Sequence, residues 1–451
     1  MSSKPSVLFV SLSGVRIKNR RLLEAGMTLP GFVERSQVIA SLPNLALLTL
    51  AAYTPEHWEV HYLDLDGIND DLIEQIVLQD YSLIAISFLT ARAYDCYAFA
   101  DILREQEQVV VLGGLHVSAM PDEAQLHASA IVVGEGEPVW ENLLKDFQAN
   151  QLKERYASSR SDIPGFSNGP IPRYDLLNIE QYNRITLQTT RGCPLSCFFC
   201  GASHTISPVR RKAISQVRRE LEAILELWPK PFIELADDNT FVNKSWGKEL
   251  LRLFAEYPIR WFTETDLSIG ADREMLNLLA KSNCAQVLIG LESPSSSTLG
   301  GMDPGKWKAR TQNKATDYIK RIQDHGISVN GCFILGSDED GPECFERTAE
   351  TIDALELAEA QITLLTAFPG TQLYSRLKSE NRLISDHFWD ACTLFDVTFE
   401  PLQMTRFELE EGFYQLMQEV YNSERVRNRK AHFNACTKIR RKSRNATVSS
   451  L

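Results

Sequence analysis

The stretch RITLQTTRGCPLSCFFCGAS, residues 184–203, places three closely spaced cysteines directly after a short apolar run. Cys193, Cys197 and Cys200 are separated by three residues and then by two. Structural zinc sites usually take four ligands in two separated pairs, and the sequence has no second pair. A zinc site completed by His204 remains the alternative. Three thiolates favour a four-iron, four-sulfur cluster in which one iron stays open for a small molecule.

The cysteine stretch opens a series of apolar segments that alternate with amphipathic helical segments. The predicted strands are 185–190, 232–237, 260–266, 286–293, 328–336 and 361–368. Predicted helices include 214–227, 271–281, 312–325 and 345–357. Six consecutive βα units predict a partial (β/α)6 TIM barrel over residues 185–384, two units short of a closed barrel. Barrel chemistry lies at the carboxyl ends of the strands, and the cysteines directly follow the first strand.

The first 150 residues show a second alternation of apolar runs and helical segments such as 68–79 and 94–106. The predicted strands are 6–12, 59–65, 83–89, 109–114 and 130–136. Continuous apolar runs separated by helices predict a doubly wound parallel α/β sheet of about five strands, Rossmann- or flavodoxin-like. Ligands bind such sheets at the carboxyl ends of the strands. Small or polar residues lie at these ends: Ser11, Ser13, Ser87, Thr90, Gly113, Gly114 and residues 134–137.

Two further regions flank the barrel. Residues 151–184 show no clear periodicity and are rich in proline and glycine at 161–177, so they predict a linker. Residues 385–451 predict a mostly helical extension, with a helix near 407–423. The basic segment 425–444 is expected to be a solvated and partly disordered tail.

Composition restricts the class of protein. The chain has 451 residues with 44% hydrophobic and 24% charged residues, which is typical of a globular protein of two or three domains. It has no apolar run of eighteen residues and no signal-peptide pattern, so no membrane span and a cytoplasmic location are expected. The net charge of −12 argues against a nucleic-acid partner. Nine cysteines, six of them scattered singly, fit a reducing compartment rather than a disulfide framework.

The fragment CPLSCFFC (193–200) resembles the signature of radical S-adenosylmethionine (SAM) enzymes, with Phe199 in the aromatic position. The longer TTRGCPLSCFFC resembles the branch of that family that carries an N-terminal cobalamin-binding domain. Segments 40–53, 109–124 and 132–140 resemble the cobalamin domain of this branch. The resemblance to the barrel of this branch lies in segments 235–243, 289–302, 331–336 and 366–374. The resemblance therefore covers most of the chain.

The resemblance implies that each of the three motif cysteines binds one iron and that the fourth iron chelates the amino and carboxylate groups of SAM. Reduction of such a cluster releases a 5′-deoxyadenosyl radical. Related enzymes place a Gly-Gly-Glu-like segment near the methionine amino group, where this chain has Asp237, Asp238 and Asn239. The implied SAM-binding residues are Phe199, Gly201, Asp237, Asp238, Asn239, Glu292, Ser293, Ile334, Leu335 and Phe368.

The resemblance also implies a cobalamin site. Its residues are expected to be Ser11, Leu42, Pro43, Ser87, Thr90, Gly113, Gly114, His116, Gly134, Glu135 and Gly136. Many cobalamin proteins supply a histidine to cobalt from the loop after the first strand, but residues 11–44 contain none. Cobalt therefore lacks that lower ligand or takes another group. His116 is expected to hydrogen-bond in the pocket for the nucleotide tail rather than to ligate cobalt.

Together these features predict an enzyme that methylates an unactivated carbon of a small molecule or natural product. Its electron donor is expected to be a protein such as a flavodoxin or a ferredoxin. Oxidative cyclisation or rearrangement without methyl transfer is one alternative, and an iron–sulfur electron carrier or zinc-stabilised binding protein is another. Modification of RNA is a third, which the basic tail invites, although there is no motif for a second cluster. Tyr374 and Trp389 are expected near the substrate opening.

Overall fold

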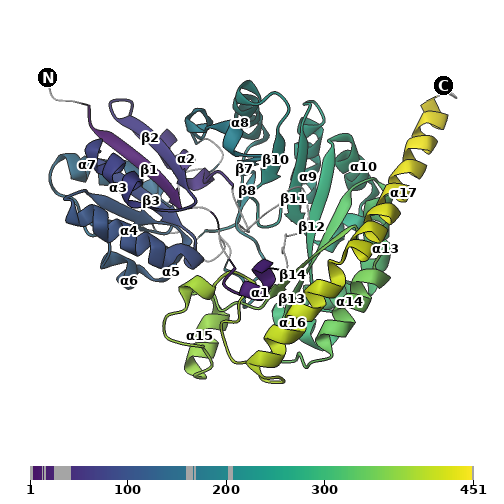
Figure 1. The fold of residues 1–451 in the computed structure, drawn as a ribbon. Coiled ribbons are helices and arrows are strands. Elements are labelled where there is room, and N and C mark those ends of the chain that lie inside the picture. Colours follow the sequence, from purple (N-terminus) through teal and green to yellow (C-terminus); the bar gives the residue numbers. More distant parts are fainter. Residues whose placement is uncertain are drawn as a thin grey trace.

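The computed structural model describes residues 4–12, 14, 17–24, 42–158, 166, 169–201 and 207–448. Two six-stranded parallel sheets dominate the fold, one in each half of the chain (Figure 1). Two positions considered in the sequence, Ser13 and His204, lie outside the described residues.

The first sheet has the strand order β2-β1-β3-β4-β5-β6. Its strands are β1 (Ser6–Leu12), β2 (Glu59–Leu65), β3 (Leu83–Phe88), β4 (Val110–Gly113), β5 (Ala130–Val133) and β6 (Arg155–Ala157). The described helices of this half are α1 (Arg20–Glu24), α2 (Leu45–Ala52), α3 (Asp70–Leu78), α4 (Ala93–Glu105), α5 (Leu115–Ala119), α6 (Pro121–Gln125) and α7 (Glu137–Gln148). The strand order reverses at β1, which pairs with both β2 and β3. This is the switch point at which open α/β sheets bind ligands.

The doubly wound sheet predicted from the sequence is confirmed, with one strand more than the expected five. The additional strand, β6, lies inside the segment predicted as a linker and pairs with β5. Three residues are too few to show an alternation of apolar and polar side chains, which is why the periodicity did not reveal this strand.

The second sheet has the order β14-β13-β12-β11-β10-β7, so its strands lie in sequence order as in an open barrel. They are β7 (Ile185–Leu187), β10 (Phe232–Leu235), β11 (Arg260–Thr265), β12 (Cys284–Glu292), β13 (Ser328–Leu335) and β14 (Glu359–Leu364). The helices of this half are α8 (Ile214–Leu227), α9 (Lys244–Phe254), α10 (Arg273–Lys281), α11 (Ser296–Met302), α12 (Trp307–Thr311), α13 (Ala315–Asp324) and α14 (Cys344–Ala354). The predicted partial barrel is thus confirmed.

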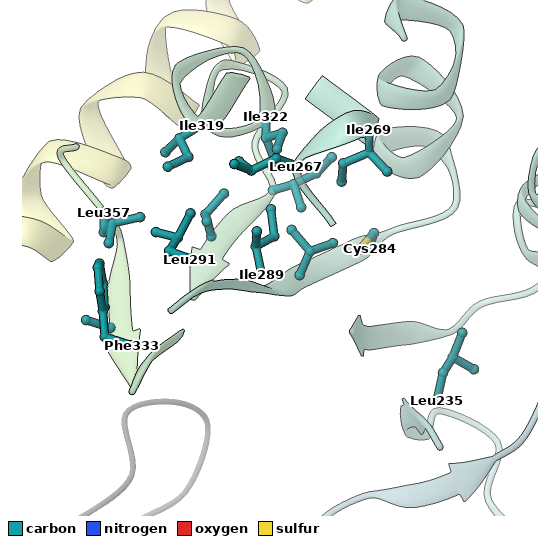
Figure 2. Packing of buried hydrophobic residues seen from close by; sticks show 14 of the residues in the cluster. Leu235, Leu267, Ile269, Cys284, Ile289, Leu291, Ile319, Ile322, Phe333 and Leu357 are labelled. Carbon is teal, nitrogen blue, oxygen red and sulfur yellow. The ribbon is translucent and has the colours of Figure 1, made fainter. Parts of the chain in front are cut away.

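The barrel core lies between the strands and the helices outside them. Figure 2 shows Ile289 and Leu291 of β12 packed toward Ile319 and Ile322 of α13. Cys284 lies in the same buried cluster, so this thiol belongs to the core. On β11, Trp261 is buried and packs on Phe254 of α9, so the odd-numbered side chains of this strand face the helices. The even-numbered side chains of β11 therefore point toward the barrel interior.

The C-terminal region returns to the first domain. It contains α15 (Gln372–Ser379), α16 (Arg406–Val420) and α17 (Ser423–Val448). Trp389 and Phe399 belong to one buried apolar cluster with Leu8 of β1 and Phe99 of α4. This segment therefore packs against the N-terminal sheet and ties it to the barrel.

The partial disorder predicted for the basic segment 425–444 is wrong, because this segment belongs to helix α17 (Ser423–Val448) at one side of the barrel (Figure 1). Arginine, lysine and alanine are good helix formers, and the polar composition concealed this propensity. The helix is long but strongly basic, and no described helix is both long and apolar enough to cross a membrane.

Candidate functional site

The three motif cysteines lie on a loop between two short antiparallel strands. Strands β8 (Thr190–Arg191) and β9 (Arg210–Arg211) pair antiparallel and form its stem. Gly192 has φ +81, and a Cβ there would lie 2.9 Å from the carbonyl oxygen of Pro208, so only glycine fits this turn. The stem follows β7 directly and therefore places the loop at the carboxyl end of the first barrel strand.

Backbone hydrogen bonds hold the cysteine loop against distant segments. The Phe198 N–H donates to the carbonyl of Met302 at 3.3 Å, and its carbonyl accepts from the N–H of Leu373 at 3.0 Å. Inside the loop, the N–H of Cys200 donates to the carbonyl of Cys197 at 3.1 Å. The loop is thus fixed by α11 on one side and by α15 on the other.

The thiols themselves are half-buried. Burial raises the pKa of Cys193, and it raises the pKa of Cys197 to about 12, against the nearby positive charge of Lys308. Among the described residues, no three His, Cys, Asp or Glu side chains converge on a point that could hold a single metal ion. A four-iron cluster does not need such convergence because each thiolate binds a different iron. Three accessible thiols on one loop fit such a cluster.

Asp237 fastens the end of β10 to the stem. Its carboxylate accepts hydrogen bonds from the backbone N–H groups of Thr189 and Thr190 at 2.7 and 2.9 Å. The hydroxyls of Thr189 and Thr240 donate to its other oxygen. Burial raises the pKa of Asp237, while these hydrogen bonds oppose the shift. The Asp237 carboxylate thus positions the segment that leads to Cys193.

The next two residues lie nearer the open end of the barrel. Asp238 accepts from the N–H of Gly192 at 2.9 Å. Asn239 donates its amide to Asp266 at 3.1 Å, but its buried Oδ1 has no hydrogen-bond partner among the described residues. The buried hydroxyl of Thr265, at the end of β11, likewise has no described partner. Buried polar atoms are usually hydrogen-bonded, so the Asn239 oxygen fits a polar ligand such as the methionine moiety of SAM, whereas odd-numbered Thr265 of β11 points away from the barrel interior.

Glu292 ends β12 with φ +64, a strained conformation for a residue other than glycine. Its carboxylate accepts from the ammonium group of Lys308 at 2.5 Å, and both side chains are largely buried. Burial opposes the charge of Lys308, but Glu292 outweighs it and holds the pKa of the lysine above its usual value. Glu292 therefore keeps the ammonium group of Lys308 charged and fixed near Cys197. The sequence gives no periodic signal for Lys308, and the interpretation missed it.

Replacing Lys308 by methionine is expected to leave Glu292 buried without a partner and to cost about 3–5 kcal/mol of stability. The loss of the positive charge should also raise the KM for SAM roughly tenfold or more, as for other residues that support a metal site. Thermal unfolding and SAM-cleavage kinetics measure the two effects. Lys306→Met, at an exposed neighbour, is the matched control. Equal KM values for the two variants would remove Lys308 from the SAM site.

The other predicted SAM residues fall into two groups. Ile334 and Phe368 are half-buried beside Phe199 at the edge of one apolar cluster, and a Cβ on Gly201 would lie 3.3 Å from the Cβ of Phe368. Leu335 and Ser293 are buried, and the Ser293 hydroxyl accepts from the N–H of Ser295 at 3.1 Å. The structure thus brings the aromatic and aliphatic residues together around the loop, whereas Leu335 and Ser293 support them from behind.

Glu264 of β11 points toward the barrel interior, where its side chain is accessible to solvent although protein surrounds it. Its carboxylate forms no hydrogen bond or ion pair with a described residue, whereas neighbouring Glu234 pairs with Arg184 at 2.9 Å. Burial, together with repulsion from Glu234, Asp238 and Glu292, raises the pKa of Glu264 to about 8. The sequence interpretation did not identify this carboxylate, since it lies before the end of its strand.

This shift predicts a pH dependence of stability. Between the usual value of 4.5 and about 8, the folded protein binds the Glu264 proton more tightly than the unfolded chain does, so stability falls as pH rises. Glu264→Gln removes this contribution. The stability of the variant relative to the wild type is therefore expected to be greater at pH 8 than at pH 5. Melting temperatures of wild type and variant across this window measure the difference. Glu350→Gln, on the exposed side of α14, should leave the wild-type profile unchanged.

The predicted cobalamin loops meet at the carboxyl ends of β3, β4 and β5. Gly114 has φ +110, and a Cβ there would lie 3.1 Å from the hydroxyl of Ser87. Ser118 donates to the carbonyl of Gly114 at 2.8 Å and accepts from the N–H of Gly134 at 2.9 Å. Gly113 precedes this turn and pairs with Val132. These contacts leave a rim of glycine backbone and serine hydroxyls, which suits a large polar ligand.

Other predicted cobalamin residues are placed differently. His116 is fully buried: its Nε2 lies 3.1 Å from the hydroxyl of Tyr97 and its Nδ1 lies 3.3 Å from that of Thr90. Both ring nitrogens are therefore engaged inside the domain. Ser11 is buried and hydrogen-bonds Tyr62. Pro43 is buried, beside half-buried Leu42, and its carbonyl accepts from the hydroxyl of Thr186 on β7 at 3.3 Å.

The expectation that Trp389 and Tyr374 lie at a substrate opening is wrong. Trp389 is completely buried, donates to Glu123 at 2.8 Å and packs on His116 with ring centroids 5.4 Å apart. Tyr374 is also buried, and its ring lies 6.1 Å from that of Trp389. Both side chains form the contact between the C-terminal region and the first domain.

Comparison with known proteins agrees with this geometry. Residues 37–144 match the B12 binding domain, residues 187–352 match the Radical SAM superfamily, and residues 371–450 match a domain of unknown function, DUF4070. The bacteriochlorophyllide d C-12(1)-methyltransferase of Chlorobaculum tepidum is 29% identical over 86% of this chain and 84% of the relative. The C-8(2)-methyltransferase of the same organism is 30% identical over 77% and 78%.

A solved structure shares the fold. The radical SAM methyltransferase TsrM of Kitasatospora setae, with cobalamin and a 4Fe–4S cluster bound, superposes with a TM-score of 0.66. Sequence identity to it is 16%, over 94% of this chain and 86% of that protein.

The two domains and the cysteine loop define a radical SAM enzyme with a cobalamin-binding domain. The chain belongs to the family of cobalamin-dependent radical SAM methyltransferases. Its cofactors are a four-iron, four-sulfur cluster, SAM and cobalamin. The family, the fold and the cofactors predicted from the sequence are confirmed.

Proposed function

We propose that the protein transfers a methyl group to an unactivated carbon of a small organic substrate. The observation that carries this proposal is the contact between the two cofactor regions: Glu135, beside the cobalamin loops, pairs with Arg191 in the stem of the cysteine loop. A methyl donor and a radical generator that share one site can act on the same carbon. The methyltransferase names of the two curated relatives support the same reaction.

Such a reaction balances with two SAM molecules and two electrons from a low-potential donor. One SAM yields methionine and 5′-deoxyadenosine, which carries away the substrate hydrogen. The other yields S-adenosylhomocysteine and the methyl group that replaces this hydrogen. The cofactors supply the radical and methyl chemistry, and the protein positions them. A flavodoxin or ferredoxin in the cytoplasm is the proposed electron donor.

We assign the residues as follows. Cys193, Cys197 and Cys200 hold the cluster. The SAM site is formed by Phe199, Gly201, Asn239, Glu292, Lys308, Ile334 and Phe368, with Asp237, Asp238, Ser293 and Leu335 positioning them. The cobalamin rim is formed by Leu42, Ser87, Thr90, Gly113, Gly114, Gly134 and Gly136, with Ser11, Pro43, His116 and Glu135 behind it. The domain boundaries remain those predicted, except that the first sheet extends to Ala157.

The barrel interior also indicates what kind of substrate group it accepts. Glu264 and Glu234 lie there with Glu292 and Asp238 close enough to repel the Glu264 carboxylate. Because its pKa is about 8, Glu264 is a neutral carboxyl group at neutral pH, which can donate a hydrogen bond to a substrate oxygen or accept one from a substrate donor. Bacteriochlorophyllide d, on which the two curated relatives act by name, is the first substrate to test.

The test is a single-turnover assay with anaerobically reconstituted protein, SAM, dithionite, cobalamin and bacteriochlorophyllide d. The measured quantities are 5′-deoxyadenosine, S-adenosylhomocysteine and the mass of the substrate. Both nucleosides with a methylated product would support the proposal. 5′-Deoxyadenosine with an unmethylated, oxidised product would favour cyclisation or rearrangement. A full iron load without 5′-deoxyadenosine would contradict radical chemistry altogether.

A further inference from the structure

Glu135 lies at the centre of a buried ion-pair cluster between the two domains. It follows β5, and only 4% of its surface is exposed. One carboxylate oxygen accepts from Arg210 and from the hydroxyl of Ser207, and the other lies 3.2 Å from Nη1 of Arg191. Burial opposes ionisation, but the two guanidinium groups outweigh it and hold the pKa of Glu135 below its usual value. The carboxylate is therefore charged and paired on both sides.

The two arginines belong to the two strands of the stem that carries the cysteine loop. Arg191 of β8 is directly opposite Arg210 of β9, and Cys193 follows Arg191 by two residues. Glu137, at the start of α7, provides a second carboxylate for Arg191 at 2.9 Å. The ring of Phe166 lies 5.0 Å from the guanidinium of Arg191 and 5.3 Å from that of Arg210. Glu135 thus holds both strands of the stem at once.

On its other side, Glu135 directly follows Gly134 of the glycine rim assigned to cobalamin and lies behind that rim. The preceding residue, Gly134, donates to Ser118, which in turn donates to the carbonyl of Gly114. A ligand that orders Gly114 and Gly134 therefore also orders the backbone of Glu135. Movement of the stem would act on the same residue from the opposite side.

We propose that Glu135 is a positioning residue that couples the cobalamin site to the iron–sulfur site. The inference rests on the proposed placement of cobalamin at the glycine rim. Cobalamin stabilises the loop that holds the stem, and an assembled cluster stabilises the stem that holds the loop. Because binding free energies are linked, each cofactor must strengthen the binding of the other by the same factor.

The experiment measures the affinity for hydroxocobalamin with and without the cluster. In the wild type, cluster-loaded protein is expected to bind hydroxocobalamin at least about fivefold more tightly than cluster-free protein, the lower end of typical coupling. In Glu135→Gln, which keeps the size and the hydrogen bond to Ser207 but loses the charge, this ratio should fall close to one. The converse measurement is the rate of iron loss to a chelator, which cobalamin should slow in the wild type and not in the variant.

Asp122→Asn is the matched control because it breaks an exposed ion pair with Arg155 in the same domain. The ratio of its hydroxocobalamin affinities with and without the cluster should equal that of the wild type. If Glu135→Gln does not fold, judged by circular dichroism, Arg210→Gln replaces it, because glutamine removes the positive charge that pairs with Glu135; its ratio of hydroxocobalamin affinities should also fall.

A wild-type ratio of one, or an unchanged ratio in the folded variant, would overturn the coupling. A wild type that binds no hydroxocobalamin in either state would instead overturn the placement of cobalamin, so the two failures are distinguishable.

Discussion

Replacing Cys197 by alanine is expected to abolish formation of 5′-deoxyadenosine from SAM. Each motif cysteine provides one thiolate, and two thiolates cannot hold a four-iron cluster in place. When several residues act as a unit, removing one of them abolishes nearly all of their joint effect. The rate of 5′-deoxyadenosine formation should therefore fall at least ~10³-fold. Iron and sulfide content, the electron paramagnetic resonance signal of the reduced cluster and chromatography of the nucleosides measure the result.

Cys436→Ala is the control for this variant. Cys436 is a free, half-buried thiol on α17, outside the cysteine loop and the SAM site. The control should keep both the cluster and the cleavage of SAM. Normal iron content and activity in Cys197→Ala, or their loss in Cys436→Ala, would assign the cluster to a different set of thiols.

Replacing Gly114 by valine is expected to remove cobalamin while the cleavage of SAM persists. The φ of +110 is strained for a β-branched residue, and the new Cβ would lie 3.1 Å from the hydroxyl of Ser87 and 3.6 Å from the carbonyl of Phe88. Such strain costs about 1–3 kcal/mol. Relief of the strain must move the glycine rim, so affinity for hydroxocobalamin should fall at least about tenfold, which corresponds to 1.4 kcal/mol. Absorbance titration measures it.

In the same variant, S-adenosylhomocysteine should no longer form, while 5′-deoxyadenosine still does. Gly67→Val is the matched control because nothing lies within 4 Å of a Cβ at that position and the residue is exposed in the same domain. Retention of hydroxocobalamin by Gly114→Val at wild-type affinity would place the cobalamin site elsewhere on the sheet.

Much of this architecture was predictable because its signals are local. Strands β1, β3 and β12 are buried in parallel sheets and therefore appear as continuous apolar runs in the sequence. The cysteine motif needs only its spacing to be recognised. In contrast, β6 has only three residues, and α17 is a helix whose charged composition resembles that of a disordered tail.

The site was predictable only in part. Cys193, Cys197 and Cys200 share one loop, as their spacing requires. Lys308, however, follows Glu292 by sixteen residues, and no periodicity relates them. The resemblance to the cobalamin-binding branch also implied Glu135 and His116 as ligand contacts. In the structure these side chains point into ion pairs and the core, since a buried carboxylate or imidazole is stabilised by whichever partners the other elements bring to it.

The sequence by itself therefore determined the two parallel sheets, their order along the chain, the cysteine loop and the cofactors. The sheets and the loop depend on residues that are neighbours in sequence, through periodicity or spacing, and the cofactors follow from the resemblance of these motifs to a known family. Only the tertiary structure decided that Glu135 holds Arg191 and Arg210, that Glu264 faces the barrel interior without a partner among the described residues, and that Trp389 closes the core of the first domain. These contacts join segments tens to hundreds of residues apart, and they arise only when burial brings opposite charges and apolar surfaces together.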